Sequence, residues 1–568
     1  MVNDFDKEKE MKIKHIHIKN FKSIKNLEID LTDINAFIGA NNAGKSNIFS
    51  AINFLLGRNY PMPANITKEM HYNGDIENKI YIKIEFNDYK FIEFFEGDDK
   101  NNDKSGLYYN GEKYRMKGDD REKYCIAYLD TERKVNSALP SNKWSLMGKI
   151  LYDINKEFSS NPKLVENFNE KAKELFNDTL LNIESFRNFS NKLSNYYNSL
   201  IKNTDTKFSL ELKNYDPWNY YKNIEILISD GANQFLADSC GMGFQSIISI
   251  AVLRAYGELQ LSKETKSPIF IEEPEIFLHP QAQRKFHRIL KDLASKNNIQ
   301  IFYNTHSPNF IDFEYFDQVF LTGKDNKEGT YVKNCKINDL IEDLNIRRKE
   351  EGKNGKDIEE NGYREQIKYN FEETCNSKQA SEAFFANKII LVERQSENTI
   401  LKYLFKMIEF DLDDNNISIV ECGCKNEIDR YYRIYTEFGI PVFVIFDSDK
   451  QIKEDDKKNK KDIEVNEKEN QVLFELLCYE YNGNFYGDNQ VKNNFLSFEY
   501  DLGKFLESDT KTKGLKLLNQ LKNKIESIQD KSSNDYYEKI ENMIKGIKDN
   551  LEKLEPLKSS VLKRCDIF

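Results

Sequence analysis

Residues 34–46 read INAFIGANNAGKS, a short apolar run followed by the pattern Gly-x-x-x-x-Gly-Lys-Ser. Glycines at both ends of such a loop let the backbone wrap around a polyphosphate with its amide N–H groups. The lysine reaches the terminal phosphates, and the serine hydroxyl suits a Mg²⁺ ion. The pattern therefore predicts a loop that binds ATP with Mg²⁺. The candidate ligands in it are Gly39, Asn42, Gly44, Lys45 and Ser46.

The segments on both sides of this loop satisfy the structural context that the pattern requires. An apolar run of strand type precedes the loop, and residues 47–56 place apolar side chains at helical spacing. The phosphates would then lie at the N-terminus of a helix, where backbone N–H groups attract anions. The alternative is a chance glycine-rich turn, which would not be expected to have both flanks.

The composition of the 568-residue chain is that of a soluble globular protein with about two to four domains. Charged residues make up 31% and hydrophobic residues 39%. The longest apolar runs, at 247–253 and 441–446, are far shorter than the roughly 18 residues of a membrane span. The N-terminus is charged and lacks the apolar segment of a secretory signal. We therefore expect a cytoplasmic protein with no membrane partner.

Charge, cysteine and histidine content limit the chemistry further. The net charge of −11 argues against coating nucleic acid through bulk charge, although a local basic groove can still bind a phosphate backbone. The eight cysteines show no framework or zinc spacing, so we expect them to be reduced. All six histidines precede residue 307. A metal site in the rest of the chain must therefore use carboxylates, which favours Mg²⁺, Mn²⁺ or Ca²⁺ over zinc.

The residue pattern divides the first half of the chain into strand-rich and helical parts. Alternating apolar residues predict strands within 12–38, at 80–86, at 91–95 and at 124–129. Farther along, the apolar spacing becomes helical and glycine nearly vanishes, which indicates a helical insertion in an α/β domain. The predicted boundaries are 1–135 for a first lobe, 136–214 for the insertion, which would serve dimerisation, and 215–325 for the second part of the domain.

Three further segments carry residues suited to nucleotide chemistry. Residues 238–246 contain a Gly-x-Gly-x-Gln loop that opens an apolar helix and can offer N–H groups to a phosphate. Residues 268–275 place two adjacent glutamates at the end of a buried strand, the first to hold Mg²⁺ and the second to polarise an attacking water. A later strand ends at a histidine that either contacts the γ-phosphate or simply completes a loop. The candidates are Gly241, Gly243, Gln245, Glu272, Glu273 and His306.

Together these elements resemble an ABC-type ATPase head of the branch that includes recombination and DNA-repair ATPases, over residues 12–325. The resemblance implies that the phosphate loop is Walker A and that 241–245 is the signature loop. It also implies that Glu272 is the Walker B carboxylate, Glu273 the catalytic base and His306 the switch histidine. Such heads work as dimers, because the signature loop of one subunit closes on the nucleotide of the other. The signature loop lacks the usual Leu-Ser-Gly-Gly sequence, and Glu272 replaces the usual aspartate. We therefore expect slow or conditional hydrolysis of ATP.

The second half of the chain begins with a polar, Lys- and Glu-rich stretch at 326–380, which we interpret as a solvated linker. In the domain predicted at 381–568, buried strands deliver carboxylates to their ends. In a parallel sheet such ends gather at one edge, where ligands bind. The carboxylates could hold one or two Mg²⁺ ions, an arrangement suited to phosphodiester chemistry, or they could merely cap loops. The candidates are Glu393, Glu397, Asp447 and Asp449.

This set of carboxylates resembles the TOPRIM domain of topoisomerases, primases and certain nucleases. An ABC-type head fused in front of it is similar to the OLD (overcoming lysogenisation defect) nuclease family, over about residues 12–450. That family includes the Gabija A subunit and retron-associated effectors of phage defence. The resemblance implies two further site residues, Glu499 in an acidic motif at 498–502 and Lys558 as the catalytic lysine.

One residue departs from the family pattern at the metal-binding edge. The family has glycine directly after the first glutamate, whereas this chain has Arg394, so a long cation replaces a small residue with a permissive φ. The guanidinium would either contact the scissile phosphate, or pair with the glutamate and compete with the metal ion.

The prediction from the sequence is an ATP-controlled, metal-dependent DNA endonuclease in phage defence, assembled as a homodimer or a dimer of dimers. The alternative is a nucleotide-gated sensor or scaffold whose degenerate TOPRIM domain recruits a helicase, a reverse transcriptase–DNA complex or another toxin without cutting DNA. Arg394 favours the alternative, and the acidic set favours the enzyme. A topoisomerase or primase is disfavoured, because the chain has no room for a strand-passage or zinc-binding region.

Overall fold

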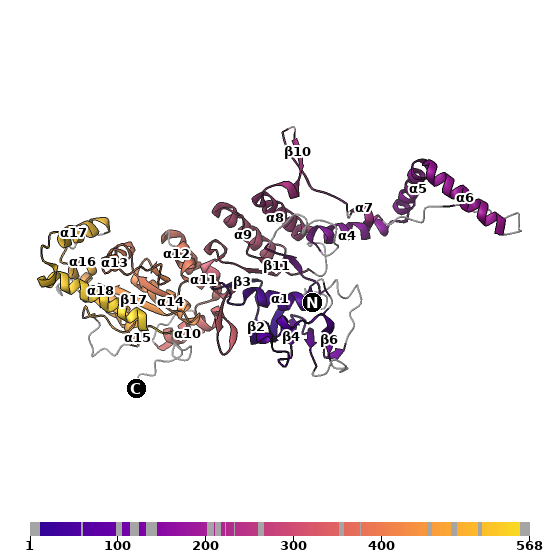
Figure 1. Ribbon diagram of the computed structural model, residues 1–568. Coiled ribbons are helices and arrows are strands. Elements are labelled where there is room, and N and C mark those ends of the chain that lie inside the picture. The colour runs from indigo at the N-terminus through magenta and orange to yellow at the C-terminus, as the bar shows by residue number, and fades with distance from the viewer. Residues whose placement is uncertain are drawn as a thin grey trace.

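The computed structural model consists of two α/β domains joined side by side, with a helical arm that projects from the first (Figure 1). A twelve-stranded sheet forms the first domain, and a four-stranded sheet forms the second. None of the helices within the described ranges is both long and apolar enough to cross a membrane. The structure describes residues 12–57, 59, 61–97, 105–113, 124–131, 145–200, 210, 217–221, 223–231, 233–259, 266–350, 357–374, 377–450, 457–478, 486–508 and 514–556.

The large sheet combines an antiparallel and a parallel half. Its strands are β1 (Ile13–Phe21), β2 (Ile24–Asp30), β3 (Ile34–Ile38), β4 (Tyr81–Phe86), β5 (Phe91–Phe95), β6 (Gly106–Tyr109), β7 (Glu112–Lys113), β8 (Ala127–Leu129), β11 (Ile269–Glu272), β12 (Ile301–Asn304), β13 (Val319–Asp325) and β14 (Gly329–Lys333). Their order is β7-β6-β5-β4-β1-β2-β14-β13-β3-β12-β11-β8. The strands from β7 to β13 pair antiparallel, and those from β13 to β8 pair parallel. The parallel half gathers the carboxyl ends of its strands at one edge.

Helices cover both faces of the parallel half, which explains why its strands are apolar throughout. Phe270 stacks on Phe302, with 4.1 Å between ring centroids, in the cluster that includes side chains of α1 (Lys45–Leu56). The neighbouring Ile271 points the other way, into the cluster that includes side chains of α9 (Pro280–Ser295). Successive residues of a strand point to opposite faces, so both clusters hold the same strands in place.

The helical arm consists of α4 (Leu146–Ser159), α5 (Pro162–Asp178) and α6 (Glu184–Leu200). It extends far from the sheet in Figure 1, and neither α5 nor α6 contains a buried residue among those described. Five large apolar side chains on α5 and α6 are exposed, namely Leu164, Leu175, Phe189, Tyr196 and Leu200. The helical insertion expected from the sequence is thus present. Its first helix, α4, packs on the core of the ATPase domain through Leu146, whereas the described side chains of α5 and α6 join no buried core cluster.

Residues 326–380 differ from the solvated linker that we expect from their sequence. They contain β14 and three helices, α10 (Ile337–Glu350), α11 (Glu360–Thr374) and α12 (Ser377–Ala383). Leu340 and Ile367 are buried in a large core cluster. Charged residues dominate the sequence of these helices, but each helix also has a narrow apolar stripe. That stripe is sufficient to pack one face of the helix against the core.

The second domain is built on a fully parallel sheet with helices on both faces. Its strands are β15 (Lys388–Val392), β16 (Ile417–Glu421), β17 (Val442–Asp447) and β18 (Phe495–Phe498), in the order β16-β15-β17-β18. Its helices are α13 (Gln395–Met407), α14 (Lys425–Glu437), α15 (Lys457–Leu476), α16 (Leu502–Phe505), α17 (Leu515–Glu526) and α18 (Asp535–Lys553). This parallel topology again places the strand ends that carry candidate carboxylates at a common edge.

The two domains share one hydrophobic core. Phe313 of the first domain stacks on Tyr431 of α14, with 5.3 Å between ring centroids and 26° between ring planes. Arg433 of α14, which is 2% exposed, pairs with Asp343 of α10 at 2.7 Å. A continuous buried cluster with a buried ion pair fixes α14 to the first domain.

Candidate nucleotide and metal sites

The phosphate loop joins β3 to α1 and depends on backbone angles that glycine adopts most readily. Gly39 and Gly44 have φ angles of 137° and 108°, where an L side chain is strained. A Cβ atom at Gly39 would lie 2.0 Å from the carbonyl oxygen of Thr322. One at Gly44 would lie 2.2 Å from Thr330 Oγ1. The loop therefore fits closely against the neighbouring strands, and α1 begins directly after it at Lys45.

The polar side chains of the loop lie around the N-terminus of α1. The buried Lys45 ammonium donates to the carbonyl oxygens of Gly39 (2.8 Å) and Ala40 (3.0 Å). Burial lowers the pKa of Lys45 to about 8. Asn42 has a positive φ of 65°, and Ser46 Oγ accepts a hydrogen bond from the end of β12 at 3.4 Å. The amide N–H groups, ammonium and hydroxyl of this loop suit the phosphates of a nucleotide and its Mg²⁺ ion.

The two adjacent glutamates lie beside this loop, and Asn304 connects them to it. The Tyr128 hydroxyl donates to Glu272, and burial together with the charge of Glu273 raises the pKa of Glu272. The Glu273 backbone N–H donates to Asn304 Oδ1 at 2.7 Å, while Asn304 Nδ2 donates to Ser46 Oγ. Asn304 is a site residue that the sequence analysis missed, although it ends a buried strand immediately before the Thr-His-Ser segment.

His306 lies on the loop after β12, and Glu275 holds that loop in place. Glu275 accepts hydrogen bonds from the His306 backbone N–H (2.6 Å) and from the Thr305 hydroxyl (2.7 Å). Burial and the charge of Lys45 lower the pKa of His306. The structure thus brings His306 within electrostatic reach of the phosphate loop. Glu275 positions this loop but was not predicted as a site residue, because only Glu272 and Glu273 match the Walker B motif.

The proposed signature loop precedes α8 (Met242–Leu259), which begins inside the Gly-x-Gly-x-Gln pattern. Gln245 is buried, and its amide donates to the carbonyl oxygens of Asp238 (2.9 Å) and Cys240 (2.8 Å). These two hydrogen bonds hold the turn that precedes α8 in place. A Cβ atom at Gly241 would meet nothing within 4 Å, whereas one at Gly243 would lie 3.3 Å from a carbonyl oxygen. An approaching partner therefore has access to the backbone at Gly241.

The buried carboxylate of Glu393 and the partly buried carboxylate of Asp447 lie at the carboxyl edge of the second sheet. Glu393 follows β15, is 5% exposed, and accepts the Asp447 backbone N–H at 2.9 Å through Oε1. Asp447 Oδ1 accepts the backbone N–H of Leu502, the first residue of α16, at 3.0 Å. Burial raises the pKa of Glu393 to about 7, and burial with the charge of Glu393 raises the pKa of Asp447. Two carboxylates in this environment need a nearby cation to remain ionised together.

Glu397 and Arg394 lie at the start of α13. The Arg394 backbone N–H donates to Glu397 Oε2 at 2.9 Å, so Glu397 caps the helix with one oxygen. Arg394 has an extended backbone, with φ −142° and ψ 173°, and an exposed side chain. This position therefore does not require the φ freedom of glycine. Among the described residues, Arg394 forms no ion pair with a carboxylate within 4.0 Å, so the pairing with Glu393 considered from the sequence is absent.

Asp449 and Glu499, also predicted as metal ligands, each pair with a lysine. Lys425 Nζ lies 2.9 Å from Asp449 Oδ2. Lys450 Nζ lies 2.6 Å from Glu499 Oε1. The predicted catalytic Lys558 lies outside the described residues. Lys425 was not predicted from the sequence, although it follows the buried strand β16 at the same edge of the sheet, because a lysine matches no metal-ligand pattern.

The chemistry of this edge fits a divalent cation. Within the described part of the chain, no three His, Cys, Asp or Glu side chains converge closely enough to form a ready-made metal site. Glu393, Asp447 and Asp449 nevertheless supply hard oxygen donors, and the first two repel each other in a buried environment. A divalent ion at this edge would relieve that repulsion. In the first domain, Ser46 and Glu272 would hold the Mg²⁺ ion of a bound nucleotide.

Comparison with known proteins identifies both domains. A family model described as "AAA ATPase domain" matches residues 11–123 and 100–311. A second family model, "Overcoming lysogenization defect protein-like, TOPRIM domain", matches residues 384–449. These matches confirm the predicted fold class, an α/β ATPase domain with a helical insertion followed by a TOPRIM domain.

Three nucleases are similar to this chain over most of their length. An OLD nuclease from Thermus scotoductus is 27% identical over 461 residues, which cover 77% of this chain and 82% of the relative. The Old nuclease of Escherichia phage P2 is 22% identical over 77% of each chain. The endonuclease GajA of Bacillus cereus (strain VD045) is 24% identical over 77% of this chain and 75% of the relative. Since the first family model spans more than half of the sequence, the chain belongs to the AAA ATPase domain family and carries an OLD-like TOPRIM domain behind its ATPase domain.

Proposed function

We propose that the chain is an ATP-regulated, divalent-metal-dependent DNA endonuclease of the OLD type that acts in defence against phage. The observation that carries this proposal is the pair of neighbouring carboxylates, the buried Glu393 and the partly buried Asp447, at the carboxyl edge of a parallel sheet on the same chain as a complete phosphate loop. Relatives named OLD nuclease and endonuclease GajA support the same activity.

In the ATPase domain, each polar residue has a role that follows from its position. Lys45 and the loop amides would bind the phosphates, and Ser46 with Glu272 would hold Mg²⁺. Glu273 would orient and polarise the attacking water, while His306 would contact the γ-phosphate. Asn304 fixes the backbone of Glu273 relative to Ser46, so the two halves of the site move together.

In the TOPRIM domain, Glu393, Asp447 and Asp449 would hold the divalent ion, with Glu397 supporting the start of α13. A bound ion supplies positive charge that stabilises the attacking and leaving oxygens of a phosphodiester. The exposed Arg394 side chain lies next to this edge and can orient a DNA phosphate through its guanidinium. The buried surroundings of Glu393 and Asp447 strengthen every electrostatic interaction made there.

The shared core supports control of the TOPRIM domain by ATP. The segment after His306 leads directly to Phe313, whose ring packs on Tyr431 of α14. The first residue of the same helix, Lys425, contacts Asp449 at the metal-binding edge. If nucleotide binding moves the loop of His306, that displacement can pass through the packed side chains of Phe313 and α14 to the carboxylates at the metal-binding edge. Close-packed elements transmit displacements in this way.

The function is tested most directly with Arg394, because the two candidate roles of its side chain predict opposite results. We expect the parent to cleave DNA with Mg²⁺ or Mn²⁺, and Arg394→Gly to cleave it about tenfold more slowly, since a charge-assisted contact to phosphate is lost. Glycine is tolerated at this N-cap position, so thermal stability should change little. The measurement is cleavage of supercoiled and linear DNA with and without ATP.

Two outcomes of this experiment would contradict part or all of the proposal. Faster cleavage by Arg394→Gly would contradict the phosphate contact and mean that the arginine obstructs the site, but it would leave the endonuclease in place. If neither protein cuts DNA in either metal, the endonuclease is rejected and the nucleotide-gated scaffold takes its place. A helicase or reverse transcriptase–DNA partner and a cytoplasmic location stay predictions from the sequence.

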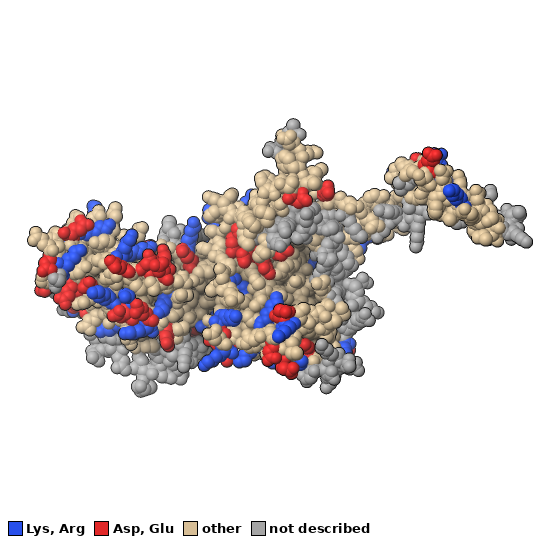
Figure 2. Space-filling model, viewed as in Figure 1, with Lys and Arg blue, Asp and Glu red and all other residues tan. Residues whose placement is uncertain are grey.

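We also infer that the chain forms a homodimer or a dimer of dimers through its ATPase heads and helical arm. The arm carries the exposed side chains of Leu164, Leu175, Phe189, Tyr196 and Leu200. The face of the arm seen in Figure 2 shows few charged atoms, although α5 itself contains lysines and glutamates. Exposed apolar surface of this kind marks an interaction site.

We therefore expect light scattering at micromolar concentration to give at least a dimer mass, with and without ATP. Phe189→Glu should shift the mass toward the monomer, because it places a charge on the apolar surface. The matched control is Tyr89→Glu, since Tyr89 is a similarly exposed aromatic residue (81%) outside the arm. A parent that is monomeric in both conditions would contradict the inference.

A further inference from the structure

A lysine and a tyrosine lie on the segment that follows β18, at the carboxyl edge of the TOPRIM sheet. The Lys504 ammonium of α16 lies over the Tyr500 ring, 3.0 Å from the ring centroid. Both residues are partly buried. Because an ammonium is attracted to the face of an aromatic ring, Tyr500 holds the cation in place. The pair is therefore an ordered positive charge beside the edge that carries Glu393 and Asp447.

The backbone of this segment is tied to two of the predicted metal ligands. The Asp449 N–H donates to the Tyr500 carbonyl oxygen at 2.8 Å. Asp447 Oδ1 accepts the N–H of Leu502, the first residue of α16, at 3.0 Å. Lys504 belongs to the same four-residue helix. These two contacts fix the position of the Lys504 backbone relative to the carboxylates.

The charge of Lys504 is not neutralised by an acidic partner within the described part of the chain. No carboxylate there lies within 4.0 Å of its ammonium, and Asp501 caps α16 by accepting the Lys504 backbone N–H at 2.8 Å. By contrast, Lys450 at the same edge pairs with Glu499 at 2.6 Å. A cation–π contact orders an ammonium but leaves its full charge available to an incoming anion.

Lys504 and Arg394 follow strands on opposite sides of β17. Arg394 lies just after β15, Asp447 ends β17, and Lys504 lies after β18, in the sheet order β15-β17-β18. Neighbouring strands are about 4.8 Å apart, so the ends of β15 and β18 are separated by about 10 Å. One strand of a DNA duplex carries a phosphate for about every 3.4 Å of axis, so this separation spans about three nucleotides. A phosphodiester placed at Asp447 would therefore have flanking phosphates near both cations.

We propose that Lys504, held by Tyr500, binds a backbone phosphate of DNA on the β18 side of the scissile phosphodiester. The inference rests on the proposed endonuclease and names residues that position its substrate. A cation is required there, because the carboxylates of Glu393 and Asp447 repel the phosphates of DNA. Arg394 and Lys504 offset this repulsion from two sides and draw the DNA strand across the end of β17.

The test is DNA binding by the full-length protein without divalent ions, so that no cleavage occurs, measured by fluorescence anisotropy at several salt concentrations. Lys504→Met keeps the length of the side chain and removes its charge. We expect it to bind a DNA duplex about tenfold more weakly than the parent at low salt, since one charge-assisted contact is lost. The slope of log affinity against log salt concentration should become shallower by about 0.9, the contribution of one phosphate contact.

Cleavage kinetics and the tyrosine provide further readouts. Lys504→Met should raise the KM for DNA and leave kcat within about twofold of the parent, because Lys504 binds substrate without touching the reacting atoms. Tyr500→Phe keeps the ring and should bind DNA like the parent. Tyr500→Leu should bind more weakly, because the ring that orders the ammonium is lost. Lys504→Gln serves if the methionine variant does not fold.

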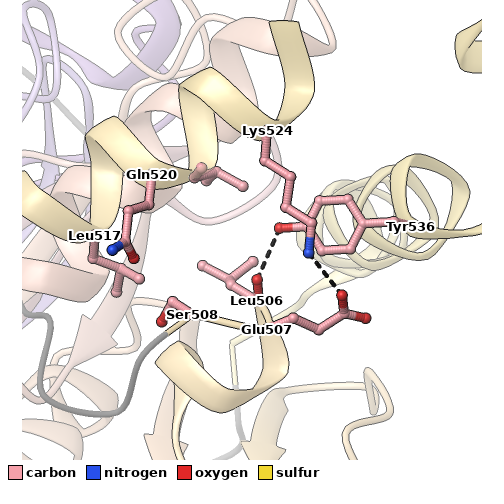
Figure 3. A pocket seen from close by; sticks show the side chains of 8 residues that line it. Leu506, Glu507, Ser508, Leu517, Gln520, Lys524 and Tyr536 are labelled. Atoms are coloured by element: carbon pink, nitrogen blue, oxygen red, sulfur yellow. Dashed lines mark hydrogen bonds and ion pairs between the residues drawn. The ribbon is translucent and has the colours of Figure 1, made fainter. Parts of the chain in front are cut away.

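A matched control is Lys524→Met in the same domain. Lys524 also lies over a tyrosine ring, that of Tyr536, but it pairs with Glu507 at 2.7 Å, at the edge of a shallow pocket between α16, α17 and α18 (Figure 3). Its charge is already neutralised, so we expect this variant to keep the affinity and the salt slope of the parent. A shallower slope in this control would show that any lost lysine charge is enough, which would overturn the assignment to Lys504.

The remaining outcomes separate this inference from the proposed function. A parent that binds no DNA, or folded Lys504 variants with the affinity and salt slope of the parent, would overturn the role of Lys504. DNA binding that depends on Lys504 in a protein that cuts no DNA would reject the endonuclease but keep this inference. DNA cleavage by Lys504→Met with the KM of the parent would do the reverse.

Discussion

Asp447→Asn is expected to lower DNA cleavage on the order of 10³-fold while ATP binding stays at the parent level. Asparagine has the shape of aspartate, and its Oδ1 can still accept the Leu502 backbone N–H that holds Asp447. The change removes only the negative charge that attracts the metal ion, and electrostatic groups of this kind contribute about this much to catalysis. The measurement is the initial rate of cleavage in Mg²⁺ and in Mn²⁺, together with ATP affinity.

Stability distinguishes this effect from misfolding. The pKa of Asp447 is raised in the folded protein by burial and by Glu393, so the ionised carboxylate destabilises the fold above its ordinary pKa. Without metal at pH 7, Asp447→Asn should therefore unfold at a temperature no lower than the parent. Glu507→Gln is a matched control, because Glu507 pairs with Lys524 in the same domain and lies outside the predicted ligands and the acidic motif at 498–502. Full cleavage by Asp447→Asn would remove Asp447 from the site.

Lys45→Ala is expected to abolish ATP binding, because the buried ammonium is the positive charge that faces the phosphates in the loop. The loss should be at least about a hundredfold in affinity, since a charge-assisted contact in a desolvated site is removed. The measurement is calorimetry or binding of a fluorescent ATP analogue. Unchanged affinity in this variant would show that the phosphate loop is not the nucleotide site.

Glu273→Gln provides the complementary result at the same site. Its backbone N–H should still donate to Asn304, because the contact does not involve the side chain. We expect this variant to bind ATP and hydrolyse it at least about a hundredfold more slowly, since the group that polarises the attacking water is lost. ATP that stays bound after gel filtration would report this state. If Glu273→Gln hydrolyses ATP at the parent rate, the catalytic base is a different residue.

Local sequence patterns determined the elements and the motifs on them. Residues 34–46 contain an apolar run and two glycines that specify a strand, a loop with positive φ angles and the start of a helix. All of these features are local, so the phosphate loop could be identified without knowledge of any distant contact. The apolar strands that end in Glu272, Glu393 and Asp447 were equally readable, because parallel strands that are buried on both faces are apolar throughout.

The residues that hold the predicted ligands in place could not be predicted from local sequence patterns. Asn304, Glu275 and Lys425 match no motif, and each acquires its role only from a partner far along the chain: Ser46, His306 and Asp449, respectively. The long helices of 326–380 were also not predicted from the sequence. Their charged residues outnumber the apolar residues that pack against the core, so the stretch resembles a solvated linker.

Local patterns therefore specify the fold class, the order of the two domains and the candidate ligands, because these depend on periodicity and on residues close together in the chain. How the ligands are held and how the domains are joined depends instead on contacts between distant parts of the chain. Phe313 meets Tyr431, Arg433 meets Asp343, and Lys425 meets Asp449. These contacts depend on how α14 packs between the two sheets, and no local pattern encodes the packing of one element on another distant in sequence.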